Sequence, residues 1–375
     1  MYSISAYGKM IADGPRVNAY VGALRQAIKP GSVVVDIGSG PGFFALVACE
    51  LGARRIFAIE KDNVIQVGRD AARDQGMADR IEFIQSISTK VTLPERADVI
   101  VSDLHGILPL FRQHLPSIID ARERFLAPGG ILIPSIDRLW AAVVEAPARY
   151  DEVVRPWEDC ALKPGRKLAV NSWSKIRAKP ADLLGPSVCW HELNFQCVED
   201  ANVSNDVSFS IARSGTAHGL ALWFDAEMGE GMGFSNAPGE AELIYGNVFV
   251  PFEQPVEVEA GDRIEVRLEA RLIGEDYSWR WDTTVISGGE AKCSFKQSTL
   301  LGAPLSISQL RKRANEHMPS LSEEGAVTRF VLSKIDGKNS NEQIAAALWE
   351  NFPRRFRNCE DALDRVVELS EKFSD

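Results

Sequence analysis

A glycine-rich turn between a strand and a helix constrains this 375-residue chain more than any other feature. Residues 34–42 read Val-Val-Asp-Ile-Gly-Ser-Gly-Pro-Gly, an apolar β-branched run that ends in glycines. A second apolar run, residues 56–59, is followed by Glu60, eighteen residues after Gly42. A strand, a glycine turn, a helix and a second strand that ends in a carboxylate are typical of the nucleotide-binding half of a doubly wound sheet.

The spacing of the glycines indicates which nucleotide binds. A dinucleotide fold places its third glycine at position 43, where this chain has Phe43. The pattern Asp36-x-Gly38-x-Gly40-x-Gly42 instead predicts a turn for S-adenosylmethionine (SAM), with Glu60 accepting hydrogen bonds from the ribose hydroxyls. Asp36 either supports the turn or reaches the methionine part of SAM. A degenerate NAD site and a glycine turn without a ligand are the alternatives.

Composition and charge exclude several classes of protein. A net charge of -10 and a pI near 5.2 argue against a broad nucleic-acid surface, because phosphate binding needs a basic face. The six cysteines are scattered, with no CxxC pair and no metal-ligand spacing, so we expect free thiols and no metal. The chain has no apparent signal segment and no apolar run long enough to span a bilayer. We therefore expect a cytoplasmic enzyme without a membrane or nucleic-acid partner.

Hydrophobic periodicity changes twice along the chain and predicts three domains. Residues 1–148 carry an N-terminal helix and then short apolar strands that alternate with helices, which predicts an α/β doubly wound sheet. Residues 149–304 contain strand-like runs separated by turn residues, as in an antiparallel β-barrel. Residues 305–375 return to helical periodicity and predict a small helical module. The strands expected in the first domain are 33–37, 56–60, 81–84, 97–102 and 130–133.

Together these segments resemble the protein arginine methyltransferase family, which joins a SAM-binding α/β domain to a β-barrel. Met10-x-x-Asp13-x-x-Arg16-x-x-x-Tyr20 is similar to the family's N-terminal helix, in which the arginine pairs with the SAM carboxylate. Ser88 and Thr89 follow the third strand, where this fold usually contacts adenine, although Thr89 replaces a glutamate of the family. The resemblance covers roughly residues 1–300 and implies SAM as cofactor and a possible homodimer, which the family forms through an arm from the barrel.

The acceptor side departs from the family. Ser102-Asp103-Leu104-His105-Gly106 lies where the family's double-glutamate loop begins. At the positions of the family's two glutamates, this chain has Asp103 and Arg112. The family's Thr-His-Trp loop is replaced by Glu-Leu-Ile-Tyr-Gly-Asn-Val at 242–248. A guanidinium stays cationic at any working pH, so Arg112 would repel it. We expect a neutral or anionic acceptor on a protein, peptide or small molecule, with Asp103 and Arg112 facing each other or the acceptor. Genuine arginine methylation and a catalytically silent SAM-binding relative are the alternatives.

Two histidines and the tail give further expectations. His105 lies two residues after Asp103 and is a candidate general base; the alternative is a loop histidine with satisfied hydrogen bonds. His114 is expected to be a solvated helix residue. Residues 330–338 are similar to small PqqD-like modules that bind leader peptides, and a helical packing domain is the alternative.

Overall fold

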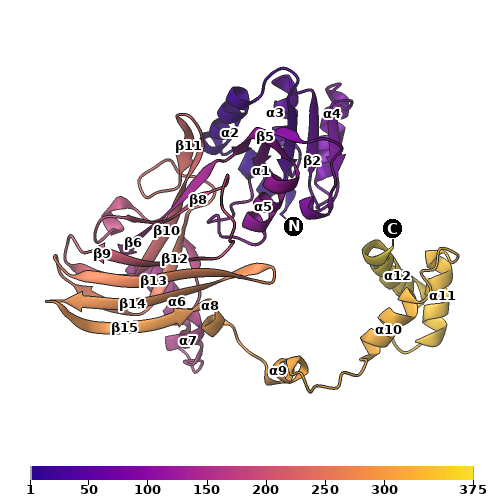
Figure 1. Cartoon of the computed structure of the whole chain (residues 1–375). Helices are drawn as coiled ribbons and strands as arrows, with labels where there is room; N and C mark the ends of the chain where they lie inside the picture. The colour runs from indigo at the N-terminus through magenta and orange to yellow at the C-terminus, as the bar shows by residue number, and fades with distance from the viewer. Residues whose placement is uncertain (1, 375) are drawn as a thin grey trace. The chain divides into compact units, whose positions relative to one another are not determined.

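The computed structural model describes residues 2–374, which fall into two compact units, Met1–Pro304 and Leu305–Asp375 (Figure 1). The first unit begins with two helices, α1 (Ile4–Ile11) and α2 (Gly14–Ala27), where we expected one. The helical path is interrupted at Asp13, and Pro15 occupies the first turn of α2, where its missing N–H has no helical partner to lose.

A parallel sheet of five strands, in the order β3-β2-β1-β4-β5, forms the first half of this unit. Val35 in the central strand β1 lies opposite Phe57 of β2 and Ile100 of β4, and every residue of β1 is buried. Helices cover a sheet of this kind on both faces, which explains why β1 is apolar throughout. The elements are β1 (Val33–Ile37), α3 (Phe43–Glu50), β2 (Arg55–Ile59), α4 (Ile65–Asp74), β3 (Ile81–Ile84), the 3-10 turn η1 (Ser88–Lys90), β4 (Ala97–Ser102), α5 (His114–Arg124) and β5 (Leu126–Ile133).

The strands expected at 33–37, 81–84 and 97–102 match the structure, whereas the last strand, β5, begins four residues earlier than expected. The next strand, β6 (Ile136–Val144), pairs antiparallel with β10 and β8. The change from parallel to antiparallel pairing therefore occurs near Pro134, before the boundary expected at residue 148.

Two antiparallel sheets make up the rest of the first unit, with the strand orders β7-β12-β10-β6-β8 and β15-β14-β13-β9. One hydrophobic core contains buried side chains of both sheets, and the Trp281 indole of β14 donates to the Pro251 carbonyl of β12 at 3.0 Å. The other face of β6, β10 and β12 packs with α6 in a second, smaller core. Apart from β6, these strands lie in the segment where we expected an antiparallel β-barrel. The elements are α6 (Pro147–Glu158), α7 (Gly165–Ala169), β7 (Ser174–Ile176), η2 (Pro180–Asp182), β8 (Val188–Asn194), β9 (Val203–Ser210), β10 (Gly215–Gly229), β11 (Met232–Ser235), β12 (Asn247–Val258), β13 (Arg263–Ile273), β14 (Asp276–Ser287), β15 (Glu290–Ser298) and α8 (Thr299–Gly302).

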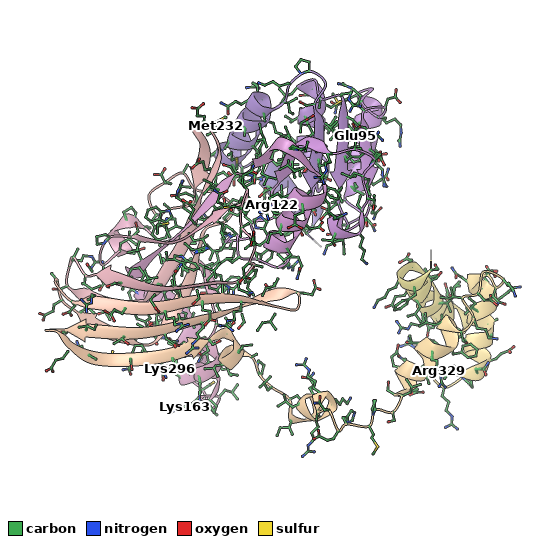
Figure 2. The ribbon with its side chains drawn as sticks, in the orientation of Figure 1. Glu95, Arg122, Lys163, Met232, Lys296 and Arg329 are labelled. Atoms are coloured by element: carbon green, nitrogen blue, oxygen red, sulfur yellow. The ribbon has the colours of Figure 1, made fainter. Side chains whose placement is uncertain are left out.

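Specific contacts fix the parallel sheet against the antiparallel ones, and Figure 2 labels two of the residues involved. Arg122 of α5 donates to the carbonyls of Phe195 and Val198, at 3.0 and 2.7 Å. Met232 of β11 packs on α2, where a Cβ added at Gly22 would lie 2.8 Å from its sulfur. The two parts of the first unit thus share contacts on both sides of the site described below.

The second unit contains α9 (Ile307–Arg313), α10 (Glu323–Leu332), α11 (Asn341–Asn351) and α12 (Cys359–Phe373). The last three helices enclose a core of their own that includes Val331, Leu348 and Val366. Ser340 caps α11 in a capping box with Gln343, as serine followed by glutamine three residues later predicts. A helical module is therefore present, while its resemblance to PqqD-like modules stays a prediction. Within residues 2–374, no helix is long and apolar enough to cross a membrane, and no cluster of three or more His, Cys, Asp or Glu side chains could hold a metal ion.

Candidate active site

The glycine turn after β1 adopts backbone angles that only glycine takes without strain. Gly38, Gly40 and Gly42 have φ values of +70°, +52° and +81°. A Cβ at Gly38 would lie 2.5 Å from the Leu104 side chain, and one at Gly40 would lie 2.9 Å from the ring of Tyr7. The helix α1 therefore packs over the turn, and any side chain at these positions would displace it or the loop after β4.

Two acidic side chains lie beside this turn. Glu60, just after β2, accepts hydrogen bonds from the backbone N–H groups of Gly40 at 3.0 Å and of Asp62 at 2.9 Å. Asp36 is buried, and burial raises its pKa to about 8. One of its carboxyl oxygens has no hydrogen-bond partner among the described residues. A buried carboxyl oxygen without a donor is costly, which fits a site where a ligand supplies the donor.

The end of β4 carries the centre of the site, the carboxylate of Asp103. One of its oxygens forms an ion pair with Arg16 of α2. The other accepts a hydrogen bond from the Tyr245 hydroxyl at 2.8 Å and lies 3.2 Å from Nδ1 of His105. Burial opposes ionisation, but the His105 contact and the Arg16 charge outweigh it and lower the pKa of Asp103 to about 2. Asp103 is therefore ionised and bound on both oxygens.

His105 lies beneath this carboxylate and is inaccessible to solvent. Its second ring nitrogen, Nε2, lies 2.9 Å from a carboxylate oxygen of Asp137, and both side chains are fully buried. The ring stacks on Phe224, with centroids 5.0 Å apart. Burial lowers the pKa of His105, but Asp137 and Asp103 more than offset it and raise the value to about 9. His105 does not fit the expected role of a general base, because its ring is inaccessible to solvent and each of its nitrogens faces a carboxylate of the protein.

Arg112 does not meet Asp103. Its guanidinium is exposed over the ring of Phe111, 5.0 Å from the ring centroid, while Arg16 occupies the position beside Asp103. The pairing of Asp103 with Arg112 is thus corrected to a pairing with Arg16. Arg112 has a φ of +45° and is the one non-glycine residue with positive φ among residues 2–374. This left-handed backbone costs about 1 kcal/mol and marks the loop between β4 and α5 as conformationally constrained.

The remaining predicted residues lie along the same edge of the parallel sheet. Ser88 is buried and its carbonyl accepts a hydrogen bond from Arg124 at 2.9 Å, whereas Thr89 is exposed. Their contact with adenine stays a prediction. Arg16 is buried, donates to the Met10 carbonyl, and keeps its Nε without a partner among the described residues. That free donor fits the carboxylate of a bound ligand.

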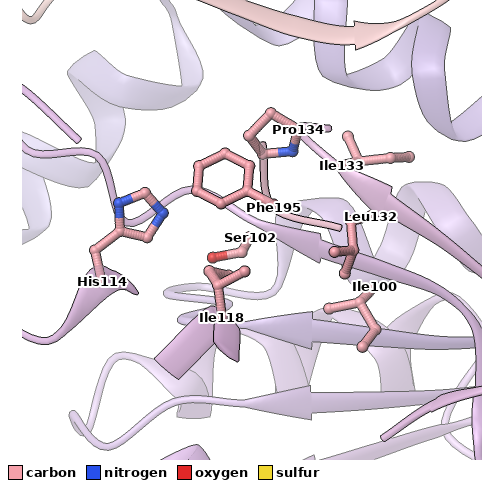
Figure 3. A pocket seen from close by; sticks show the side chains of 8 residues that line it. All are labelled: Ile100, Ser102, His114, Ile118, Leu132, Ile133, Pro134 and Phe195. Atoms are coloured by element: carbon pink, nitrogen blue, oxygen red, sulfur yellow. The ribbon is translucent and has the colours of Figure 1, made fainter. Parts of the chain in front are cut away.

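His114 is buried at the start of α5, so the expectation of a solvated residue is wrong. It lines a small apolar cavity between β4, β5 and α5 (Figure 3). Its Nδ1 lies 2.8 Å from the Pro109 carbonyl, and burial together with the nearby His105 charge lowers its pKa to about 3. His114 is therefore neutral and plays a packing role beneath the site.

Sequence reasoning missed Tyr245 and Asp137. Tyr245 lies in the segment that replaces the family's Thr-His-Trp loop, and this position was its only signal. Asp137 shares the buried face of β6 with Leu139 and Ala141, where every second residue points to the core. An acidic residue on the apolar face of a strand was the signal that could have identified it.

Comparison with known proteins agrees with this geometry. A family model described as Ribosomal protein L11 methyltransferase (PrmA) matches residues 18–150, which span the parallel sheet and its glycine turn. The parallel sheet carries this turn and a carboxylate after its second strand. Together with the family match, these features define a SAM-dependent methyltransferase. The predicted enzyme class and cofactor are thereby confirmed.

Two relatives identify the family more closely. Protein arginine N-methyltransferase 6 of Xenopus laevis is 31% identical over 242 residues, which cover 59% of this chain and 69% of the relative. Arginine N(omega)-methyltransferase of Streptomyces achromogenes subsp. streptozoticus is 29% identical over 273 residues, covering 69% of this chain and 74% of the relative. The chain belongs to the protein arginine N-methyltransferase family.

A solved structure agrees in fold. The Trypanosoma brucei PRMT1 enzyme-prozyme heterotetrameric complex with AdoHcy superposes with a TM-score of 0.73 at 17% identity, covering 79% of this chain and 98% of that chain. The predicted fold class, a parallel α/β domain followed by antiparallel sheets, is confirmed.

Proposed function

We propose that this enzyme transfers the methyl group of SAM to a neutral or anionic group on a peptide, protein or small molecule, and not to a guanidinium. The observation that carries the proposal is the state of Asp103. Both of its oxygens are occupied, by Arg16 on one side and by Tyr245 and His105 on the other. A carboxylate that already faces two cations has little attraction left for a third.

The charges around the acceptor side support the same conclusion. Arg16 and His105 are cationic, and they balance the carboxylates of Asp103 and Asp137. Arg112 adds an exposed positive charge on the loop after β4. A guanidinium methyltransferase must offset the substrate charge with carboxylates, and this cluster offers no net negative charge to do so.

An open groove beside the site gives an acceptor room to bind. It has a volume of about 350 Å³, and its lining includes Ile244, the residue before Tyr245. Its charged side chains are of both signs, and Arg177 pairs with Glu242. The volume suits a small molecule or a few residues of a peptide. The lining residues are Lys9, Ala12, Asp13, Gly14, Pro15, Arg177, Glu242, Leu243 and Ile244.

Different residues would bind different parts of SAM and the acceptor. Glu60 and the glycine turn would hold the ribose, and Arg16 and Asp36 would hold the methionine end, through the donor and acceptor atoms that lack partners. Bound SAM supplies a methyl group on a sulfonium that is already activated for displacement. Asp103 keeps 17% of its side-chain surface exposed, and as the accessible member of its cluster it would orient the acceptor. Orientation is the main requirement of an in-line transfer.

The competing function is arginine methylation, which the names of both relatives favour. Incubation with labelled SAM and fractionated cell extract, followed by acid hydrolysis, distinguishes the two. We expect label in a fraction that contains no methylarginine, and loss of that label with Asp103→Asn. Label found entirely in methylarginine would contradict the proposal. A homodimer and a cytoplasmic location, both expected from the sequence, stay part of this proposal.

A further inference from the structure

We propose that Asp137 is a positioning residue that holds His105 as a cation and thereby locks the Asp103 carboxylate in place. The starting point is the ring of His105, which meets an acidic oxygen at each nitrogen. Nδ1 lies 3.2 Å from Asp103, and Nε2 lies 2.9 Å from Asp137. Neither the double-glutamate loop nor the glycine turn contains Asp137, which lies in β6.

A third contact fixes the proton on Nδ1. The Tyr20 hydroxyl donates to the Ser102 carbonyl at 3.0 Å, so its single proton is used. The same hydroxyl oxygen lies 3.4 Å from Nδ1 of His105 and can only accept there. Nδ1 must therefore carry a hydrogen, which it shares between Tyr20 and Asp103.

The opposite side of the ring then decides its charge. Asp137 is fully buried, and neither of its carboxyl oxygens has a hydrogen bond among residues 2–374. Within that part of the chain, His105 is the one cationic side chain at ion-pair distance from it. Burial raises the pKa of Asp137, and the charge of His105 opposes that rise. The two buried groups are therefore charged together or neutral together, and the second carboxylate at Nδ1, Asp103, favours the charged pair, in which Nε2 is also protonated. A ring protonated on both nitrogens is an imidazolium.

The groups that face His105 from every side agree with a cation. Phe224 of β10 stacks on the ring, and Phe234 of β11 and Tyr245 approach its edge. His114 lies 5.2 Å away, centroid to centroid, and is neutral. The charged and titratable side chains next to His105 are thus Asp103, Asp137, Tyr20, Tyr245 and His114. Arg16 acts on the ring indirectly, by its ion pair with Asp103.

The consequence reaches the cofactor side through Asp103. The imidazolium and Tyr245 hold one oxygen of Asp103, which leaves the other directed at Arg16. A neutral ring keeps its Nδ1 contact with Asp103 but loses the charge that strengthens it, so the carboxylate and the Arg16 side chain paired with it are held less firmly. Asp137 acts at a distance, because it contacts neither Arg16 nor Asp103.

The test is nuclear magnetic resonance of the full chain labelled with ¹⁵N-histidine, in which His105 is assigned by its loss in His105→Gln. We expect both ring nitrogens of His105 to be protonated at pH 7 in the unaltered protein. In Asp137→Asn we expect a neutral ring, protonated on Nδ1 alone. Asp225→Asn, which removes an acid from the neighbouring strand β10, is the matched control and should leave His105 cationic.

Affinity for S-adenosylhomocysteine, measured by calorimetry at pH 6 and pH 8, tests the link to Arg16. Asp137→Asn should weaken binding about tenfold at pH 8 and recover part of that loss at pH 6, where the ring regains its proton. His105→Gln should lose affinity at both values without recovery. A merely structural role would give no such dependence on pH.

A neutral His105 at pH 7 in the unaltered protein would overturn the proposal, and this measurement needs no variant. An imidazolium that persists in Asp137→Asn would also overturn it. So would a loss of affinity in that variant, relative to the unaltered protein, that is the same at the two pH values, since Asp36 titrates in this range in both proteins. None of these results depends on the acceptor, so they are separate from the test of the proposed function.

Discussion

The hydroxyl of Tyr245 donates a hydrogen bond to the Asp103 carboxylate across 142 residues of sequence, at 2.8 Å. Burial raises the pKa of Tyr245 well above its usual value, so the hydroxyl keeps its proton and remains a donor. The bond joins the loop before β12 to the end of β4. It therefore connects the antiparallel domain to the carboxylate for which we propose a role in orienting the acceptor.

Tyr245→Phe removes this donor and keeps the ring, which stacks on Phe234. We expect the free energy of unfolding to fall by about 2 kcal/mol, because the lost hydrogen bond has a charged acceptor. Tyr277→Phe is the matched control, because the Tyr277 hydroxyl donates at 2.8 Å to the neutral Ala201 carbonyl. This variant should lower the free energy of unfolding by about 1 kcal/mol or less. Chemical denaturation measures both. Equal losses in the two variants would mean that the Asp103 bond has no special strength.

Glu60→Ala should weaken SAM binding by an order of magnitude or more, since a charge-assisted contact to a ribose hydroxyl contributes roughly 1.5–3 kcal/mol. Glu60→Gln keeps acceptor capacity for the Gly40 N–H and should be less damaging. Calorimetry at a fixed pH gives both affinities, with circular dichroism as the control for folding. An unchanged affinity in a folded Glu60→Ala variant is incompatible with the ribose assignment.

The stability of the first unit should fall as the pH rises from about 6.5 to about 9. His105 has a raised pKa, so its contribution is complete below its unfolded value and is lost as the pH passes through about 9. The full shift corresponds to about 3 kcal/mol. The variant with both His105→Gln and Asp137→Asn removes the coupled pair together and should lose less stability over this interval. The contribution of Asp36, whose pKa is also raised, is common to both proteins. Denaturant titrations at four pH values give the two slopes, and equal slopes would refute the assignment to His105.

Residues 1–304 should fold and bind SAM without the tail. The first compact unit ends at Pro304 in the sequence, and α10, α11 and α12 enclose their own core. Purification of the truncated chain, followed by calorimetry with SAM, checks this expectation. An insoluble product, or a folded one without SAM affinity, would show that the tail contributes to the cofactor domain.

Local patterns predicted the cofactor side of the site, and long-range contacts decided the acceptor side. The glycine turn and Glu60 are close in sequence, and their backbone requirements leave few alternatives. Asp103 was identified because it ends a strand at the ligand-binding edge of the sheet. The side chains around Asp103 come from separate elements of the fold: Arg16, Tyr245 and, by way of His105, Asp137. No periodicity in the sequence predicts that they lie close together. The mismatch at His105 has the same origin, because burial between two carboxylates is a tertiary property.

The most direct test of the altered acceptor site compares the unaltered protein with Arg112→Glu on a peptide rich in glycine and arginine. Labelled SAM is supplied to both, and methylarginine is measured after hydrolysis. Arg112→Glu restores a carboxylate at the family's second acidic position, and Arg112 lies on the surface, so the fold should tolerate the change. The account predicts little methylarginine from either protein, because Asp103 stays paired with Arg16 and His105 whichever residue stands at position 112. Abundant methylarginine from the unaltered protein, abolished by Asp103→Asn and not increased by Arg112→Glu, would contradict it.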